Sequence, residues 1–444
     1  MKKVIIALLF ILALASCKSQ NNESNTPPTK AFEDGKVFIT DLEDEELEKP
    51  NATISSFDDF TYALDYLAYY GVDEKVYFYI SDDYSKNFYN PYQEFVKAYN
   101  AALIAETYNC LFFNEYYDSN KAIAVKYSIS KDIATEKSER DNKYVLVKNY
   151  DFKLEGDNNY TPELFSNNKG TISCETSDQL YYLVSNGYLP NPKEGSVAKE
   201  IYDEAINVLK KYINSNMTDY QKIRALYDYM TYEIQYDYVA ASSEDYLPPK
   251  QAYYLEGVFL NHVAVCDGRA KAMSVLLNFI GIDCKRCTGK NSDSDHAWNI
   301  VNLDNKWYLL CSTWSQKKRY EIDSNIYVTP SHNMLLTSKD TPYGDDWGYV
   351  TDKYKDLYES LEKEEYGLYD HKIKNIDEAK DIIDLALSKS ESVINVELYY
   401  TGGGKNFETE LTNYVNSLND KNKIYKARSL TNELYEVILF YEGN

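Results

Sequence analysis

The alternation of apolar and polar residues first becomes regular at Ser56. The stretch SFDDFTYALDYLAYYG has the period of an amphipathic helix that opens on a serine cap. Its apolar face comprises Phe57, Phe60, Ala63, Leu64 and Leu67. A strand pattern, KVYFYI, follows, then a second helical stretch, YQEFVKAYNAALIAE, and a second strand, KAIAVKYSI. This order predicts a small α+β module over residues 55–190.

A similar order of patterns returns near the C-terminus. The stretches NIDEAKDIIDLALSKS, SVINVELYY, FETELTNYVNSL and YEVILFYE predict helix, strand, helix and strand. A shift of 319 residues, without a gap, places the N-terminal FDD on IDE and the N-terminal KNF on a second KNF. We therefore interpret residues 350–444 as a second α+β module and a candidate repeat of the first. Neither module contains a catalytic arrangement of side chains, which favours packing or ligand docking.

The first 17 residues have the pattern of a secretion signal. MKKVIIALLFILALASC begins with two lysines, continues as an apolar run and ends in small residues. Its last four residues, LASC, resemble a bacterial lipobox, which implies cleavage before Cys17 and attachment of lipid to that thiol. The chain would then be exported and anchored by lipid to a bacterial cell membrane or outer membrane. Residues 18–54 lack apolar periodicity and are predicted to form a flexible tether.

The middle of the chain begins with a boundary at NPKEGSV, and we assign residues 196–347 to a central domain. Two helical stretches open it, and a third helix is predicted to begin at Cys266 and to end at Gly281. A cysteine at the start of a helix meets unpaired N–H groups and the positive end of the helix dipole, which lower the pKa of a thiol. The neighbouring Asp267 raises that pKa, and Gly268 leaves room for a backbone or a substrate. Cys266 is therefore a candidate nucleophile, although a packed apolar cysteine fits the same pattern.

The stretch HAWNIVNLDNKWYLLC predicts a β-hairpin with a two-residue turn at 304–305. His296 and Trp298 lie on the same face, because side chains alternate along a strand. With this turn Cys311 pairs opposite Trp298 and lies diagonal to His296, within reach of the imidazole. Thiol catalysis needs a Cys, a His that takes its proton and a third group that orients the His. The spacing therefore predicts a contact between His296 and Cys311, which together with the candidate nucleophile Cys266 are residue types that thiol catalysis can use.

Three sequence blocks in this region resemble the motifs of the transglutaminase-like superfamily, whose fold is papain-like. The blocks are VCDGRA, HAWN and WY followed by STW, and the resemblance covers about residues 198–314. It implies that Cys266 is the nucleophile and His296 the base, without a cofactor or a metal. It also implies a core of helices packed on an antiparallel sheet, so that the fold class of the whole chain is α+β. The implied reaction is thiol acyl transfer, as amide cross-linking or peptide hydrolysis, on a protein or peptide substrate such as a cell-wall peptide.

Two positions depart from the family pattern: Cys311 stands where the family has Asp, and Arg269 where it has an aromatic ring. A neutral thiol accepts hydrogen bonds poorly, and loss of the equivalent charge in a serine protease lowers turnover by roughly 10⁴. Three interpretations stay open. The site is degenerate and keeps only its fold; it is a weakened enzyme assisted by Asp293 or Asp295; or its three residues form a disulfide beside a His or bind zinc, with no fourth ligand evident. The non-catalytic alternative is a lipoprotein that binds peptide or glycan in the former active-site cleft.

Composition narrows the range of partners. The formal net charge of −23 argues against a nucleic-acid partner, because phosphates require Lys and Arg.

Cys284 and Cys287 form a CxxC within a strand-like stretch, where residues three apart point to opposite faces, and we interpret them as structural thiols. His332 and His371 lie in polar stretches and are predicted to be surface histidines.

Overall fold

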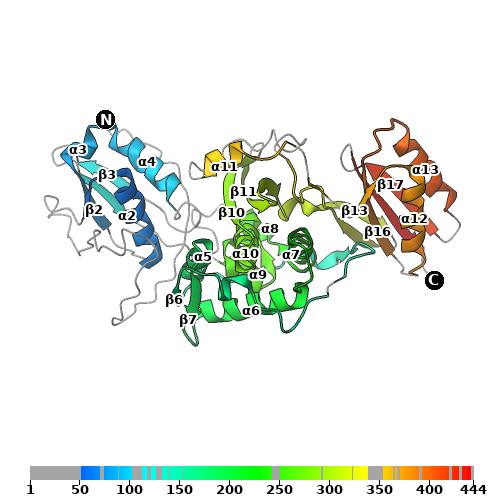
Figure 1. Cartoon of the computed structure of the whole chain (residues 1–444), viewed down its shortest axis with the longest axis horizontal. Helices are drawn as coiled ribbons and strands as arrows, with labels where there is room; N and C mark the ends of the chain where they lie inside the picture. The colour runs from blue at the N-terminus through cyan, green and yellow to red at the C-terminus, as the bar shows by residue number, and fades with distance from the viewer. Residues whose placement is uncertain are drawn as a thin grey trace.

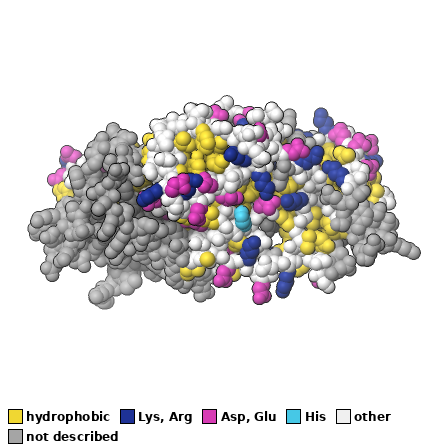
Figure 2. All heavy atoms as spheres, turned by 90° about the horizontal axis from the view of Figure 1, so that it is seen from below, with side chains coloured by type: hydrophobic (Ala, Val, Ile, Leu, Met, Phe, Trp, Pro, Cys, Tyr) yellow, Lys and Arg dark blue, Asp and Glu magenta, His cyan; other side chains and the backbone are white. Residues whose placement is uncertain are grey.

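In a computed structural model the N-terminal module, the central domain and the C-terminal module lie in a row (Figure 1). The structure describes residues 52–70, 75–88, 90–102, 113–117, 122–126, 133–139, 141–153, 155–242, 251–291, 294–322, 324–338, 354–363, 366–367, 371–389, 393–419, 423–429 and 433–441. The predicted signal sequence with Cys17 and nearly all of the predicted tether lie outside these ranges. Within them, no helix has both the length and the apolar character that a membrane span requires. On the face seen in Figure 2, acidic and basic side chains are interspersed.

The N-terminal module is a four-stranded sheet with helices packed on it. Its elements are β1 (Ala52–Ile54), α2 (Phe57–Tyr70), β2 (Lys75–Ile80), α3 (Asp82–Ser85), α4 (Pro91–Ala101), β3 (Phe113–Tyr117) and β4 (Ala122–Lys126). The apolar face predicted for α2 forms the core, where Phe60 contacts the rings of Phe78 and Phe95. The strand order is β1-β2-β4-β3.

The C-terminal module has the same topology. Its elements are β15 (Lys372–Ile373), α12 (Ile376–Leu387), β16 (Val393–Tyr400), α13 (Phe407–Ser417), β17 (Lys423–Ser429) and β18 (Leu434–Tyr441). The strand order is β15-β16-β18-β17. In both modules the first two strands pair in parallel and the other neighbours pair antiparallel. Two parallel neighbouring strands need a crossover connection, and in each module a helix joins the first strand to the second. The strand order that the two modules share is the order that a repeat would produce.

The central domain is built around α10 (Cys266–Phe279), in which all residues except Cys266 and Asn278 are buried. Its other helices are α5 (Ser177–Ser185), α6 (Val197–Tyr212), α7 (Asp219–Glu233), α8 (Tyr238–Ala241), α9 (Leu255–Phe259) and α11 (Lys355–Glu359). Its strands include β8 (Gln235–Tyr236), β9 (Val263–Ala264), β10 (Cys284–Asn291), β11 (Ser294–Leu303), β12 (Lys306–Leu310), β13 (Gln316–Ile322) and β14 (Asn325–Pro330). Helix α10 contacts α5, α7 and α9 as well as the antiparallel sheet β10-β11-β12. The fold is α+β, as predicted.

The boundary before the central domain lies earlier in the chain than the predicted residue 190. Strand β5 (Tyr144–Leu146) pairs in parallel with β14, and β6 (Thr171–Cys174) pairs with β7 (Leu189–Pro192). The apolar side chains of Leu164, Cys174 and Leu180 are buried in the core of the central domain. Residues 144–192 therefore belong to the central domain, because their apolar side chains complete its core.

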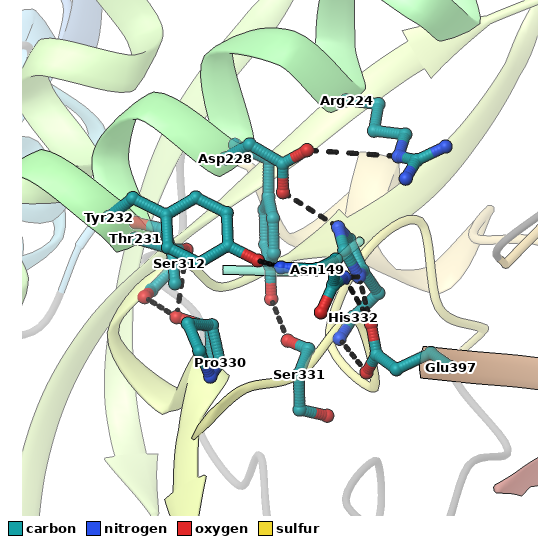
Figure 3. A network of polar contacts seen from close by, with 12 residues as sticks. Asn149, Arg224, Asp228, Thr231, Tyr232, Ser312, Pro330, Ser331, His332 and Glu397 are labelled. Carbon is teal, nitrogen blue, oxygen red and sulfur yellow. Dashed lines mark hydrogen bonds and ion pairs between the residues drawn. The ribbon is translucent and has the colours of Figure 1, made fainter. Parts of the chain in front are cut away.

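A buried polar network joins the C-terminal module to the central domain (Figure 3). The Nε2 atom of His332, just after β14, lies 2.7 Å from Asp228 of α7, and its Nδ1 contacts Glu397 of β16. Asn149 donates a hydrogen bond of 2.8 Å to Glu397. His332 and His371 are only 3% and 5% exposed, so the prediction of surface histidines is wrong. Their polar sequence context gave no sign of partners that are distant along the chain.

Candidate active site

Cys266 is the first residue of α10, as the apolar period predicted. The cap residue Val265 offers no side-chain hydrogen bond to the first turn, so the N–H groups and the dipole of the helix act on the thiol. A Cβ at Gly268 would lie 2.6 Å from the carbonyl oxygen of Ala252 and 3.0 Å from that of Tyr254. The close approach expected at Gly268 is therefore made by the backbone of the chain itself.

His296 lies near the start of β11 and is 6% exposed. Its ring stacks on Trp298, with centroids 6.1 Å apart, and lies 5.3 Å from the ring of Trp314. Burial lowers the pKa of His296 to about 4, because a buried imidazolium loses its hydration. The imidazole is therefore neutral at pH 7, and one of its two nitrogens can accept a proton.

The third predicted residue, Cys311, contacts this imidazole. The hairpin has the predicted register, with Leu303 opposite Lys306. The turn residues at 304–305 have φ angles of 55° and 62°, as a two-residue type I′ turn requires. The Sγ atom of Cys311 lies 3.3 Å from Nε2 of His296. Pairing of the two strands thus produces the contact that the spacing predicted.

Helix α10 packs against strand β11, which carries His296. The backbone N–H of Ala297, the residue after His296, lowers the pKa of the Cys266 thiol, whereas Cys311 raises it. The buried side chain of Asn299 donates a hydrogen bond of 2.8 Å to the carbonyl oxygen of Ala270, which fixes β11 against the first turns of α10. The structure therefore shows the contact between His296 and Cys311, and it places the strand that carries His296 against the helix that begins at Cys266.

The disulfide interpretation is wrong for this structure, because neither Cys266 nor Cys311 forms a disulfide bond. No group of three His, Cys, Asp or Glu side chains within the described ranges is arranged to hold a metal ion. Of the two acids considered as helpers, Asp295 is exposed and Asp293 lies outside the described residues.

Burial raises the pKa of the Cys266 thiol to about 12, and the carboxylate of Asp267 acts in the same direction. Cys266 is the one partly exposed cysteine among those in the described ranges, and water that reaches the sulfur reduces this effect. Asp267 is fully buried and pairs with Lys271, at 2.8 Å, and with Arg286. These cations offset much of the charge that the sequence placed beside the nucleophile, and Arg286 also lowers the pKa of Cys266.

Arg269, at the position where the family has a ring, is fully buried and connects α10 to two other segments. Its Nη1 donates to the carbonyl oxygen of Ile234 at 3.0 Å, and its Nη2 donates to those of Met230 and Ser312, both at 2.8 Å. Met230 and Ile234 lie at the C-terminal end of α7, where carbonyl groups favour a cation. Sequence reasoning identified Arg269 as a departure but missed this role, because its partners lie far away in the chain.

The CxxC cysteines behave as the sequence predicted. Cys284 and Cys287 lie in β10, are buried and do not form disulfide bonds. Cys284 packs in the main core of the central domain, whereas Cys287 packs in a separate cluster with Trp298. The two side chains therefore point to opposite faces of the sheet.

Residues 206–310 match the model of the transglutaminase-like superfamily. The matched range ends one residue before Cys311. The chain therefore contains a transglutaminase-like domain, and the resemblance drawn from the three sequence blocks is confirmed.

Two curated relatives each match about a third of the chain. The Kyphoscoliosis peptidase of Homo sapiens is 28% identical over 168 residues, which are 34% of this chain and 24% of that protein. The Kyphoscoliosis peptidase of Mus musculus is 28% identical over 148 residues, which are 29% of this chain and 22% of that protein. The chain thus spans about a quarter of the length of these relatives.

Two solved structures are also similar. A crystal structure described as a TGase is 20% identical, with a TM-score of 0.22, over 28% of this chain and 34% of that one. A protein from Cytophaga hutchinsonii, described as a candidate cysteine protease, is 13% identical, with a TM-score of 0.19, over 46% of this chain and 61% of that one. At these TM-scores neither structure adds to the family match.

Proposed function

We propose that the protein is an exported, lipid-anchored enzyme of the cell envelope that performs thiol acyl transfer on a protein or peptide. The observation that carries the proposal is the arrangement at the start of α10. Cys266 begins this helix, the backbone of Ala297 in β11 lowers the pKa of its thiol, and His296, the residue before Ala297, is a buried neutral imidazole in contact with Cys311. The family match over residues 206–310 supports this assignment.

In the proposed reaction the sulfur of Cys266 attacks the carbonyl carbon of an amide, and a ring nitrogen of His296 takes the thiol proton. Negative charge then develops on the carbonyl oxygen, where N–H groups of the first turn of α10 can stabilise it. The C–N bond breaks, and the amine leaves with the proton from His296. A thioester on Cys266 remains. Attack by water completes peptide hydrolysis, and attack by a second amine completes an amide cross-link.

The pKa values of the two groups set the charge state of the site before substrate binds. Burial raises the pKa of Cys266 to about 12 and lowers that of His296 to about 4. Both groups are therefore neutral before substrate binds, and His296 acts as a general base rather than as half of a resting ion pair.

A second candidate function is non-catalytic binding of peptide or glycan by an exported, lipid-anchored protein, without a nucleic-acid partner. The observation that favours it is the thiol of Cys311 at the position of the family's carboxylate, since a neutral thiol orients an imidazole poorly.

The test compares the full-length wild-type protein with Cys266→Ser and with Cys174→Ala, a matched control at a buried free thiol in the core. Incorporation of a labelled amine into a glutamine-containing protein and hydrolysis of cell-wall peptide are measured for each. We expect activity in the wild type and the control and none in Cys266→Ser. Equal rates in all three proteins would refute acyl transfer, and peptide binding without turnover would favour the second function.

A further inference from the structure

The two departures from the family pattern lie together in the structure. The Nη2 atom of Arg269 donates a hydrogen bond of 2.8 Å to the carbonyl oxygen of Ser312, the residue that follows Cys311. Cys311 is also among the acidic groups that act on the pKa of this guanidinium. A position that has gained a cation therefore neighbours a position that has lost a carboxylate.

Arg269 is a buried cation in need of a counter-charge. Its hydrogen bonds go to three backbone carbonyl oxygens, and its Nε–H has no acceptor among the described residues. The acidic groups that act on it most strongly are the thiol of Cys311 and the phenols of Tyr227, Tyr236 and Tyr238. A free thiol ionises near pH 8.5 and a phenol near pH 10. Cys311 is therefore the group of these four that can supply the counter-charge at the lowest cost.

The protonation of Cys311 also determines which nitrogen of His296 carries the proton. A neutral thiol would donate its S–H to Nε2, and the proton of the neutral ring would then sit on Nδ1. That tautomer leaves no lone pair free to accept the proton of Cys266. A thiolate can only accept, so it keeps the ring proton on Nε2 and leaves the lone pair of Nδ1 available. The thiolate form is therefore the one in which His296 can act as a base.

We propose that Cys311 is a thiolate in the resting protein, that Arg269 holds it in this form, and that it replaces the family's carboxylate in orienting His296. Arg269 is then a positioning residue that acts through Cys311. Among the described residues, the ionisable groups known to act on Cys311 include His296 of β11, Arg269 and Cys266 of α10, and Tyr227 of α7. The catalytic consequence rests on the proposed function, but the charge of Cys311 can be measured without any turnover.

The direct test is the ultraviolet absorbance of the thiolate during a pH titration of the full chain. Cys266→Ser is compared with the double variant Cys266→Ser/Cys311→Ser, so that the difference spectrum reports Cys311 alone. We expect a difference of one thiolate at pH 7. A difference that appears only above the ordinary thiol pKa of about 8.5 would overturn the proposal.

The role of Arg269 is tested in the Cys266→Ser background. Arg269→Gln should raise the titration midpoint of Cys311 by about one to three pH units, because a neighbouring cation lowers the pKa of an acid by about that amount. Arg269→Lys keeps the charge and should leave the midpoint low. An unchanged midpoint in Arg269→Gln would overturn the role of Arg269. If Arg269→Gln does not fold, the test uses Arg269→Lys. A titration midpoint of Cys311 in Arg269→Lys that differs from the midpoint in Cys266→Ser alone would then overturn the role of Arg269.

Activity separates this inference from the proposed function. Cys311→Ser should lower kcat/KM by up to about 10⁴-fold, as loss of an orienting charge does in a serine protease, and Cys311→Asp should restore it. Full activity in Cys311→Ser would refute the orienting role while acyl transfer itself stands. A thiolate at Cys311 in a protein without acyl transfer would refute the proposed function and leave the charge of Cys311 established.

Discussion

Replacement of Glu397 by glutamine should weaken the attachment of the C-terminal module to the central domain. Glu397 is fully buried in β16. It accepts hydrogen bonds from the backbone N–H of His332 at 2.9 Å and from Asn149 at 2.8 Å, and it contacts Nδ1 of His332. Burial, the largest single effect, raises the pKa of Glu397, but the charge of His332 and the hydrogen bonds from His332 and Asn149 together outweigh burial and lower it. In the variant, Asp228 is the one carboxylate left in contact with the imidazolium (Figure 3).

The size of the effect follows from the charge on His332. Burial would lower its pKa, but Asp228 and Glu397 raise it from 6.5 to about 10. At about 1.4 kcal/mol per pH unit, this rise corresponds to about 5 kcal/mol, shared between the two carboxylates. Removal of one partner from a buried ion pair costs about 3–5 kcal/mol, so we expect the free energy of unfolding to fall by about 3 kcal/mol. Each kcal/mol lowers the Tm of a domain with the length of the C-terminal module by about 4–8 °C, which predicts a fall of about 12–24 °C.

Scanning calorimetry at pH 7 measures this change. The chain has several units, so the transition that contains the C-terminal module is compared rather than a single free energy. Asp377→Asn is the matched control, because Asp377 lies in the same module and forms an exposed pair with Lys380 at 3.1 Å. Surface pairs contribute about 0–1 kcal/mol, so the control should stay close to the wild type. If Glu397→Gln melts at the same temperature as the control, the network does not hold the module.

Three further outcomes can be measured. Because the pKa of His332 is raised, its stabilisation of the fold is complete below about pH 6.5 and is lost as the pH rises through about 10. The Tm of the wild type, measured by calorimetry, should therefore fall as the pH approaches 10, and the Tm of Glu397→Gln should fall less over the same range. Gly268→Ala places a Cβ 2.6 Å from the carbonyl oxygen of Ala252, so we expect about 1–3 kcal/mol of destabilisation and slower acyl transfer; an unchanged Tm would mean that the backbone yields freely. Cys17→Ser should move the protein from the membrane fraction to the soluble fraction in cell fractionation, and retention in the membrane would refute lipid attachment at Cys17.

Regular elements were predictable wherever their apolar residues follow a local period. Helices α2, α4, α12 and α13 and strands β2, β16 and β18 lie in the stretches expected of them. Strands β3 and β17 were missed; both are at the edge of their sheets, where a strand needs less apolar sequence. The register of the β11–β12 hairpin was also predictable, because a two-residue turn fixes each pair that follows it.

In the candidate site, too, the features that follow from local spacing were predictable. Cys266 opens a helix with a clear apolar period, and the hairpin register places Cys311 beside His296. These are local relations, because each depends on spacing within one helix or one hairpin.

The environment of these residues depended on contacts between distant segments. The cations that pair with Asp267, the carbonyl groups that hold Arg269, and the carboxylates around His332 come from other elements of the chain. Helical and strand periods report which face of an element is buried, but they do not report which element covers that face. The protein's local architecture and its three site residues can therefore be read from residue spacing, whereas charge compensation in the core and the docking of the C-terminal module arise only when remote segments pack together and must satisfy one another's buried polar groups.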